Sequence, residues 1–260
     1  MKSGNSAMVR RINREVIREA LRTRGEAGIA ELSRSTGLSP ATCSNIIPGL
    51  VADGEVLELD ERRSRGGRPA RVYAYNPDHT LIAAILLLCA DGGTAIRHSI
   101  RNGAGAVVSS GAAAPEPFSL KRLDAFLDRL LRDFPAIRAV ALSVPGVVDN
   151  SGGAEMCDIA ELSGVNLEKH IRSRHALATV VENDTNFAAA GYQSNHPETA
   201  GSGLAFMLFP VDKAPGCGIA LGGALVKGKS NFAGEVSFIP FGAAPPCSVE
   251  EEAARLCCAV

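Results

Sequence analysis

Residues 39–54, SPATCSNIIPGLVADG, form a pattern typical of one short helix held between two turns. Ser39 is a good N-cap, and Pro40 suits the first helical position because that position needs no N–H donor. Pro48 lies inside the same segment, where a proline removes a backbone hydrogen bond. We therefore expect a helix that either bends after Ile47 or weakens the domain that contains it.

Two helix patterns precede this segment, and a strand pattern follows it. Residues 8–24 repeat apolar side chains at helical spacing, and residues 29–36 form a shorter pattern of the same kind. Residues 55–59 then alternate between charged and apolar side chains, as in the first strand of a β-ribbon. Three helices followed by a ribbon predict a winged helix-turn-helix domain over residues 8–75.

The third predicted helix and the segment after the ribbon carry side chains suited to duplex DNA. Thr42, Ser44 and Asn45 lie in the half of the helix that meets base edges in a helix-turn-helix, and asparagine can hold adenine through two hydrogen bonds. Four arginines on a glycine-containing arm can reach phosphates: Arg62, Arg63, Arg65 and Arg68. A helix-turn-helix that docks another protein, followed by a solvated linker, is the alternative. The basic arm at the right distance favours DNA.

Length and composition predict a soluble two-domain protein with a basic head. The chain has 260 residues, of which 46% are hydrophobic and 21% charged. Residues 1–75 hold 13 basic and 9 acidic side chains, whereas the remainder holds 14 and 19. No signal peptide is visible, and the longest apolar run is too short to cross a membrane. Seven cysteines without a paired spacing are typical of reduced thiols in the cytoplasm.

After residue 80 the pattern changes to strands followed by alternating helices and strands, which predicts an α/β domain over residues 80–260. The expected strands lie at 81–88, 95–101, 106–108, 137–144, 178–181, 204–209 and 217–221. The expected helices lie at 120–134, 167–175, 185–193 and 248–258.

Two polar side chains follow a predicted strand, at the place where α/β sheets bind ligands. Asn183 and Asp184 come directly after the strand pattern, so they are expected at the carboxyl end of the sheet. Glu235 lies in a later turn and adds a second carboxylate. Carboxylates and an amide suit polyols, whose hydroxyls both donate and accept hydrogen bonds. Asp184 can also serve as the N-cap of the following helix.

The whole series of motifs resembles the ROK family of repressors, open reading frames and sugar kinases. The matching segments, in order after the helix-turn-helix and the Gly-Gly-Arg-Pro arm, are Gly92-Gly93-Thr94, Val144 to Asp149, Glu182 to Asn186, Gly216 to Gly223 and Phe232 to Glu235. The resemblance implies an actin-like ATPase (ribonuclease H-like) body. It further implies that Asn183, Asp184 and Glu235 bind a sugar, and that Asp184 matches the catalytic base of the kinases.

The resemblance also assigns two phosphate loops, and here the chain departs from the family. The loops match Gly92, Gly93 and Thr94, and Gly216 and Gly218. The acid expected before the first loop is Ala90, and the second loop has Ala214 and Pro215, of which the proline lacks an N–H. The histidine of the Glu235 segment is replaced by Phe238, and a zinc-binding cysteine loop is missing.

These departures predict a degenerate kinase-like domain. We expect no catalysis, with Asp184 as a vestigial base, and no metal or cofactor. The chain stops at Val260, short of the family pattern, so a shortened second lobe is expected.

The sequence therefore predicts a DNA-binding transcriptional regulator of carbohydrate metabolism, acting as a repressor. Its expected partners are operator DNA, a small sugar effector and a second copy in a homodimer or higher oligomer. The alternative is a ROK-type sugar kinase that phosphorylates a hexose with ATP. A third reading is a truncated and only partly functional paralogue.

Overall fold

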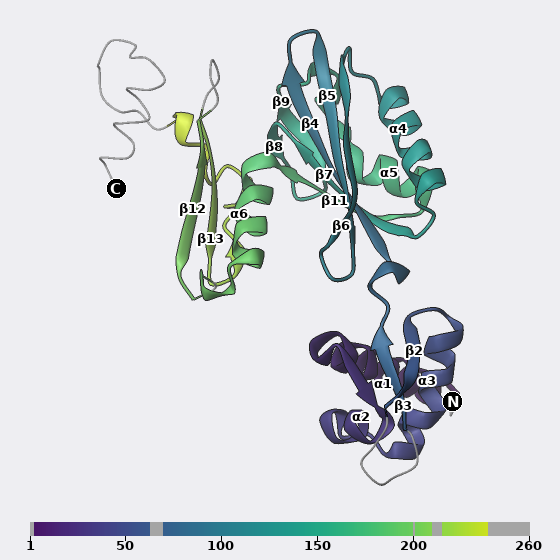
Figure 1. Ribbon diagram of the computed structural model, residues 1–260. Coiled ribbons are helices and arrows are strands. Elements are labelled where there is room, and N and C mark those ends of the chain that lie inside the picture. Colours follow the sequence, from purple (N-terminus) through teal and green to yellow (C-terminus); the bar gives the residue numbers. More distant parts are fainter. Residues whose placement is uncertain (1–2, 63–69, 200, 210–214, 239–260) are drawn as a thin grey trace, which may run out of the picture. The chain divides into compact units, whose positions relative to one another are not determined.

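The computed structural model describes residues 3–62, 70–199, 201–209 and 215–238 of the chain (Figure 1). The residues group into two compact units. The first comprises Met1–Ile82 with Arg101–Val108, and the second comprises Ala83–Ile100 with Ser109–Val260.

The first unit holds three helices and a three-stranded sheet of order β1-β3-β2. Its elements are α1 (Ser3–Arg24), β1 (Glu26–Gly28), α2 (Ile29–Thr36), α3 (Pro40–Ala52), β2 (Val56–Arg62), β3 (Ala70–Tyr75) and η1 (Pro77–His79). Helix α2 has the predicted bounds, whereas α1 begins earlier than the predicted residue 8. Both strand pairs are antiparallel, so β2 and β3 form the predicted ribbon.

One apolar core joins the three helices to this sheet. Its fully buried side chains come from α1 (Ile17, Leu21), α2 (Leu32), α3 (Cys43, Ile47, Leu50) and β2 (Val56). A leucine or isoleucine removed from water in this way contributes about 1.5–3 kcal/mol. The core therefore fixes which face of α3 points inward, and it leaves Ser44 and Asn45 exposed.

Pro48 does not end α3, which runs without interruption from Pro40 to Ala52. The proline thus does not break the helix after Ile47, and the reason lies in exposure. Pro48 has no N–H to give to the carbonyl of Ser44 one turn earlier. Because Pro48 and Ser44 are both exposed, water can take the place of that donor. Ser39 caps the helix as predicted, accepting a hydrogen bond from Thr42 N–H at 3.1 Å.

A group of ion pairs ties α1 to the start of the ribbon. Glu55 accepts hydrogen bonds from Arg14 at 2.7 Å and from Arg18 at 2.7 Å, and Arg14 also reaches Asp53 at 2.6 Å. Only 13% of the Glu55 side chain is exposed. Burial by itself would raise the pKa of Glu55, but the two guanidinium groups hold it below its ordinary value. Arg14 and Arg18 are thus engaged within the unit.

The second unit is built on a five-stranded sheet of order β11-β7-β4-β5-β6. Up to this sheet's last strand the elements are β4 (Leu81–Ala90), β5 (Gly93–Asn102), β6 (Val107–Glu116), α4 (Leu120–Asp133), β7 (Ile137–Val144), β8 (Gly146–Val148), β9 (Gly153–Cys157), η2 (Ala160–Leu162), β10 (Val165–Asn166), α5 (Leu167–His175) and β11 (Ala178–Asn183). Strands β4, β5 and β6, expected at 81–88, 95–101 and 106–108, follow one another in the sheet as a meander. Strands β7 and β11 are parallel, with Asn183 opposite Val144.

Helices α4 and α5 cover one face of this sheet (Figure 1). Helix α4 places four buried side chains along one side: Leu123, Phe126, Leu127 and Leu130. Strand β4 alternates in step, with Ala83, Ile85 and Leu87 buried. The buried sides of the helix and the strand therefore pack into one apolar layer. We expect Leu127→Ala in this layer to lower the free energy of unfolding by about 2–5 kcal/mol.

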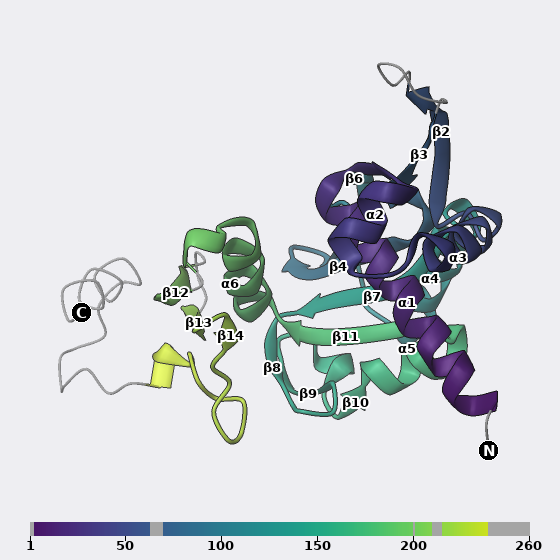
Figure 2. The same ribbon diagram turned by 90° about the horizontal axis from the view of Figure 1, so that it is seen from below.

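A second, smaller sheet follows, of order β12-β13-β14. The remaining elements are α6 (Asp184–Asn195), η3 (Pro197–Thr199), β12 (Gly203–Leu208), β13 (Gly216–Leu221), β14 (Ala224–Leu225) and η4 (Val236–Phe238). Helix α6 starts where β11 ends and packs against β12 and β13 (Figures 1 and 2). Helix α6 thereby links the two sheets at Asn183 and Asp184, the polar residues that were expected at the end of a strand.

The sequence patterns missed the small sheet β10-β9-β8, whose strands are only two to five residues long. The predicted helix over residues 248–258 lies outside the described residues. None of the described helices is both long and apolar enough to span a membrane.

Candidate functional site

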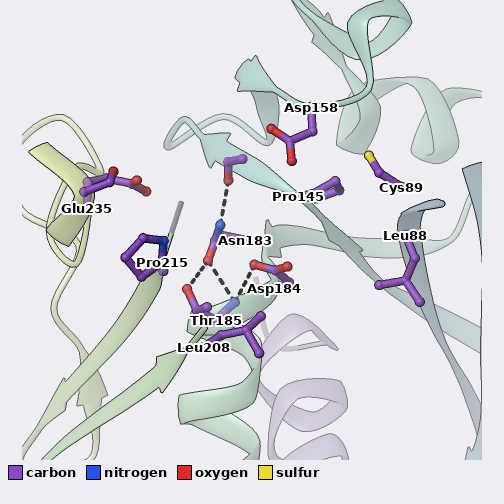
Figure 3. Close-up of a pocket in the computed structure, with 13 residues that line it drawn as sticks. Leu88, Cys89, Pro145, Asp158, Asn183, Asp184, Thr185, Leu208, Pro215 and Glu235 are labelled. Atoms are coloured by element: carbon purple, nitrogen blue, oxygen red, sulfur yellow. Dashed lines mark hydrogen bonds between the residues drawn. The ribbon is translucent and has the colours of Figure 1, made fainter. Parts of the chain in front are cut away.

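A pocket of about 690 Å³ lies in the second unit, where β11 passes into α6. Figure 3 shows its labelled side chains around one space. The lining combines apolar Leu88 and Leu208 with polar Asn183, Asp184 and Glu235. All three predicted sugar-binding residues therefore line the same pocket.

Asn183 is held firmly by the helix that it begins. It is the N-cap of α6, and its Oδ1 accepts hydrogen bonds from Thr185 N–H at 2.9 Å and Asn186 N–H at 3.2 Å. Its Nδ2 donates to the carbonyl of Gly146 at 2.7 Å. The alternative expectation that Asp184 caps the helix is therefore wrong. Asn183 has one amide hydrogen left for a ligand.

Asp184 and Glu235 bring two carboxylates to this pocket from opposite sides (Figure 3). Asp184 is the first residue of α6, and its Oδ1 accepts from Thr185 N–H at 2.8 Å. Burial, together with the negative charge of Asp184, raises the pKa of Glu235 above its ordinary value. A half-buried pair of this kind can accept hydrogen bonds from two ligand hydroxyls, and the raised pKa of Glu235 favours its protonated form.

The loop that carries Glu235 is fastened to the rest of the pocket. Lys227 Nζ forms an ion pair with the buried Glu182, directly before Asn183 in the chain. Asn231 is 7% exposed and donates through Nδ2 to the carbonyl of Val148 at 2.7 Å. Gly234 lies against the carbonyl of Cys217, where an added Cβ would come within 1.8 Å of the oxygen. These contacts fix Glu235 relative to β8, β11 and β13.

The glycines assigned to phosphate loops have packing contacts in this structure. A Cβ at Gly93 would lie 2.2 Å from the carbonyl oxygen of Glu116, and Thr94 is buried. A Cβ at Gly218 would lie 2.2 Å from the carbonyl oxygen of Thr185, so this glycine lets β13 approach α6. Gly216 lines the pocket, whereas Gly92, Gly93 and Thr94 are not among its lining residues.

The segment from Val144 to Asp149 forms a tight turn beside the pocket. Gly146 has φ of 121° and its Cα faces the carbonyl of Met156, so a side chain would not fit. Asp149 Oδ1 accepts hydrogen bonds from Gly153 N–H at 2.9 Å and Ser151 N–H at 2.6 Å. The hydrogen bond from Gly153 and those from Ser151 lower the pKa of Asp149. The turn presents Pro145 and Gly146 to the pocket.

Asp158 is a third carboxylate in the pocket, and the sequence patterns did not identify it. It follows β9, one of the short strands that the patterns missed, and it lies in no family motif. Across the part of the chain that the structure describes, no group of three or more histidine, cysteine, aspartate or glutamate side chains is arranged to hold a metal ion. Cys247, Cys257 and Cys258 lie outside that part.

The predicted DNA-binding residues of α3 lie beside α1 in the first unit. A groove of about 500 Å³ is lined by Arg10, Asn13, Thr42 and Asn45, together with apolar Val9 and Ile46. Ser44 and Asn45 are exposed, and the Thr42 hydroxyl lies 2.9 Å from the hydroxyl of Ser39.

Arg10 and Asn13 were not predicted. The two residues are three positions apart, so they are neighbours on the polar face of α1, and this spacing is the sequence signal that could have identified them.

Arg62 is the last residue of β2, and the structure does not describe its side chain. Arg63, Arg65 and Arg68 also lie outside the described residues. Their predicted contacts with phosphates stay a prediction.

The chain is similar in sequence to known proteins along most of its length. The sequence profile of the ROK family matches residues 89–258. A xylose repressor of Caldicellulosiruptor bescii is 24% identical over 243 residues, which is 90% of this chain and 59% of that protein. A protein of Caldicellulosiruptor sp. (strain Rt8B.4), provisionally named as a xylose repressor, is 27% identical with the same coverage. The chain thus spans about three fifths of these relatives.

Solved structures share the fold. A ROK family transcriptional regulator, a homologue of the E. coli MLC protein, has a TM-score of 0.64 at 19% identity, covering 92% of this chain and 62% of the other. A ROK family glucokinase from Streptomyces griseus, solved with glucose and AMPPNP, has a TM-score of 0.51 at 22% identity. The similarity covers 62% of this chain and 51% of the glucokinase chain. The second unit therefore has the α/β fold that regulators and sugar kinases share.

Proposed function

Because the chain belongs to the ROK family, we propose that it is a DNA-binding transcriptional repressor of carbohydrate metabolism that responds to a small sugar. The first unit acts as a winged helix-turn-helix, and the second as a sugar-binding domain. One observation carries the proposal. The same chain has a helix α3 with exposed polar side chains and a pocket lined by Asn183, Asp184 and Glu235. The xylose repressors among the relatives support it.

The first unit has the chemistry that DNA contact requires. Asn45 is exposed on α3 for base readout, while Arg10 beside it can contact a phosphate. Arg65 and Arg68 extend the basic surface from the arm. Two such heads in a homodimer would match a two-fold operator.

Regulation follows from linkage between the two units. A sugar that binds the second unit more tightly in one arrangement of the dimer shifts the population toward that arrangement. If the favoured arrangement spaces the two heads differently from the operator half-sites, sugar weakens DNA binding by the same factor that DNA weakens sugar binding.

Binding of the full chain to duplex DNA at several salt concentrations tests the DNA part. Arg65→Ala with Arg68→Ala should weaken binding to all sequences and flatten the salt dependence, because fewer counterions are released. Asn45→Ala should instead reduce the difference in binding free energy between the preferred DNA sequence and other sequences by about 1–3 kcal/mol. Arg34→Ala, a change at an exposed side chain of α2, is the matched control. Unchanged binding in both test variants, with folding intact, overturns the DNA proposal.

We further propose that the second unit lacks kinase activity. Phosphoryl transfer depends on holding the nucleotide and neutralising its charge. Pro215 has no N–H to offer a phosphate, and Gly93 is packed against β6. Both features speak against a nucleotide held as the family resemblance implies. A coupled assay with hexoses, pentoses and ATP should show no turnover above background. Turnover that disappears in Asp184→Asn would establish the kinase instead.

A further inference from the structure

A second pocket, of about 490 Å³, lies in the second unit between the central sheet and α6. Strand β4 lines it with Ala84 and Leu86, which alternate with the buried side chains of that strand. The pocket therefore lies on the sheet face opposite to the one that α4 and α5 cover (Figure 1). Helix α6 borders it with Phe187 and Ala188. Among the lining residues that the structure describes, it shares only Asp184 with the larger pocket.

Two serine hydroxyls in the lining of this second pocket lack a hydrogen-bond partner among the described residues. Ser143 on β7 is only 8% exposed, and neither its Oγ nor the buried Oγ of Ser99 on β5 has such a partner. A hydroxyl that is buried without a hydrogen bond destabilises the folded chain, and such groups are rare in native proteins. A ligand that offers a donor or an acceptor beside Ser143 removes this penalty.

The rest of the lining is largely apolar, and its charges have opposite signs. Phe187 offers an aromatic ring and Arg97 a guanidinium group, both of which interact favourably with another aromatic ring. The charge of Arg97 is opposed by that of Asp184. Burial and the nearby Arg129 lower the pKa of His98, so this side chain adds no charge at neutral pH. The lining therefore favours neither an anion nor a cation.

We propose that this second pocket binds an uncharged, hydroxylated aromatic molecule, whose ring packs against Phe187 and whose hydroxyl bonds to Ser143. Its volume lies in the range of small-molecule sites, about 300–1,000 Å³, and such sites combine apolar walls with a few polar groups. A phenolic hydroxyl both donates and accepts, so it suits a serine hydroxyl in either direction. The inference goes beyond the proposed sugar binding and does not depend on it, because the two pockets have different linings.

Fluorine NMR of the full chain at neutral pH, with 4-fluorophenol and with fluorobenzene, tests this inference. The two probes have the same fluorinated ring and differ in the hydroxyl group. We expect 4-fluorophenol to bind at least about fivefold more tightly than fluorobenzene, because only the phenol gives the Ser143 hydroxyl a partner. Equal affinity of the two probes, or no binding of 4-fluorophenol, overturns the inference and leaves the proposed sugar binding untouched.

Two variants with matched controls locate the binding site. Ser143→Ala should reduce the ratio of the two affinities at least about threefold, whereas Ser110→Ala, the same change at an exposed position of β6, should leave it unchanged. Ala188→Leu should weaken the binding of both probes at least about tenfold, because the larger side chain fills the pocket. Ala112→Leu, at another exposed position of β6, is its control. Urea unfolding verifies that each variant is folded. A ratio that Ser143→Ala does not change, or undiminished binding by folded Ala188→Leu, overturns the inference.

Discussion

Lys227 and Glu182 form an ion pair in which the glutamate side chain is only 5% exposed. The same carboxylate accepts hydrogen bonds from Asn183 N–H at 2.9 Å and from the Asn186 amide at 3.1 Å. Glu182 thus connects the end of β11, the first turn of α6 and the loop that leads to Glu235. The geometry of the pocket depends on this buried carboxylate and on the cation that neutralises it.

We expect Lys227→Met to destabilise the second unit by about 1–3 kcal/mol, because it leaves a buried carboxylate without its cation. Urea unfolding measures the loss. The chain has no tryptophan, so tyrosine fluorescence follows unfolding. Tyr192 is the tyrosine that lies in the second unit, whereas Tyr73 and Tyr75 lie in the first.

Two further variants separate the charge effect from lost packing. Lys227→Arg should recover part of the stability, and Lys227→Met combined with Glu182→Gln should be more stable than Lys227→Met alone. A stability change below about 0.5 kcal/mol in Lys227→Met would show that the pair is solvated and does not fix the loop.

Glu235→Gln should stabilise the second unit at neutral pH while weakening sugar binding. The folded-state pKa of Glu235 is raised above its ordinary 4.5 by burial and by Asp184, so folding favours the protonated form. The parent therefore loses stability as pH rises from 4.5 through that raised value, and the glutamine variant does not. Urea unfolding between pH 4 and pH 8, with exposed Glu155→Gln as control, measures the difference. Parallel pH profiles for parent and Glu235→Gln would contradict the prediction.

Glu55→Gln should destabilise the first unit by about 1–2 kcal/mol at neutral pH, because Arg14 and Arg18 lose a largely buried partner. The pKa of Glu55 is held below its ordinary 4.5, so its contribution is present above that value and is lost as pH falls through the lower folded value. The measurement is unfolding followed by Tyr73 and Tyr75 in a Tyr192→Phe background. Glu19→Gln, which affects an exposed pair with Arg22, should change stability by less than about 0.5 kcal/mol. Equal effects of the two changes would contradict the assignment.

Local sequence signals predicted the elements that depend on them. Ser39 and Pro40 identified the start of α3, and the continuous apolar run from Leu81 to Leu88 identified β4. The first turn of α1 was missed because Ser3 to Ser6 contain poor helix formers. Pro48 lies inside an uninterrupted α3, a place that a rule based on proline alone, without regard to exposure, does not favour.

Contacts between distant segments could not be predicted in the same way. The residues Asn183, Asp184 and Glu235 were found because each lies in a motif or after a strand. Asp158 and Lys227 lie in no motif and follow no strand that the patterns identified, and only the folded chain brings them to the pocket region. Their positions depend on short strands and turns, whose sequence signals are weak.

Gly218 offers a last test, because a packing role and a phosphate-binding role predict different results for one methyl group. A Cβ at Gly218 would lie 2.2 Å from the carbonyl oxygen of Thr185, so Gly218→Ala must push β13 away from α6. We expect a loss of about 3 kcal/mol or more in the second unit, since backbone atoms cannot give way as a side chain can. Gly191→Ala is the matched control: it lies on the exposed side of α6 with no atom within 4 Å of the new Cβ. It should stabilise the unit by about 0.5–1 kcal/mol, because alanine restricts the unfolded chain. Urea unfolding of both variants, without any nucleotide present, gives the comparison. If Gly218→Ala is as stable as the parent, the close approach of β13 to α6 is not required, and a role in holding a ligand phosphate becomes the better account of this glycine.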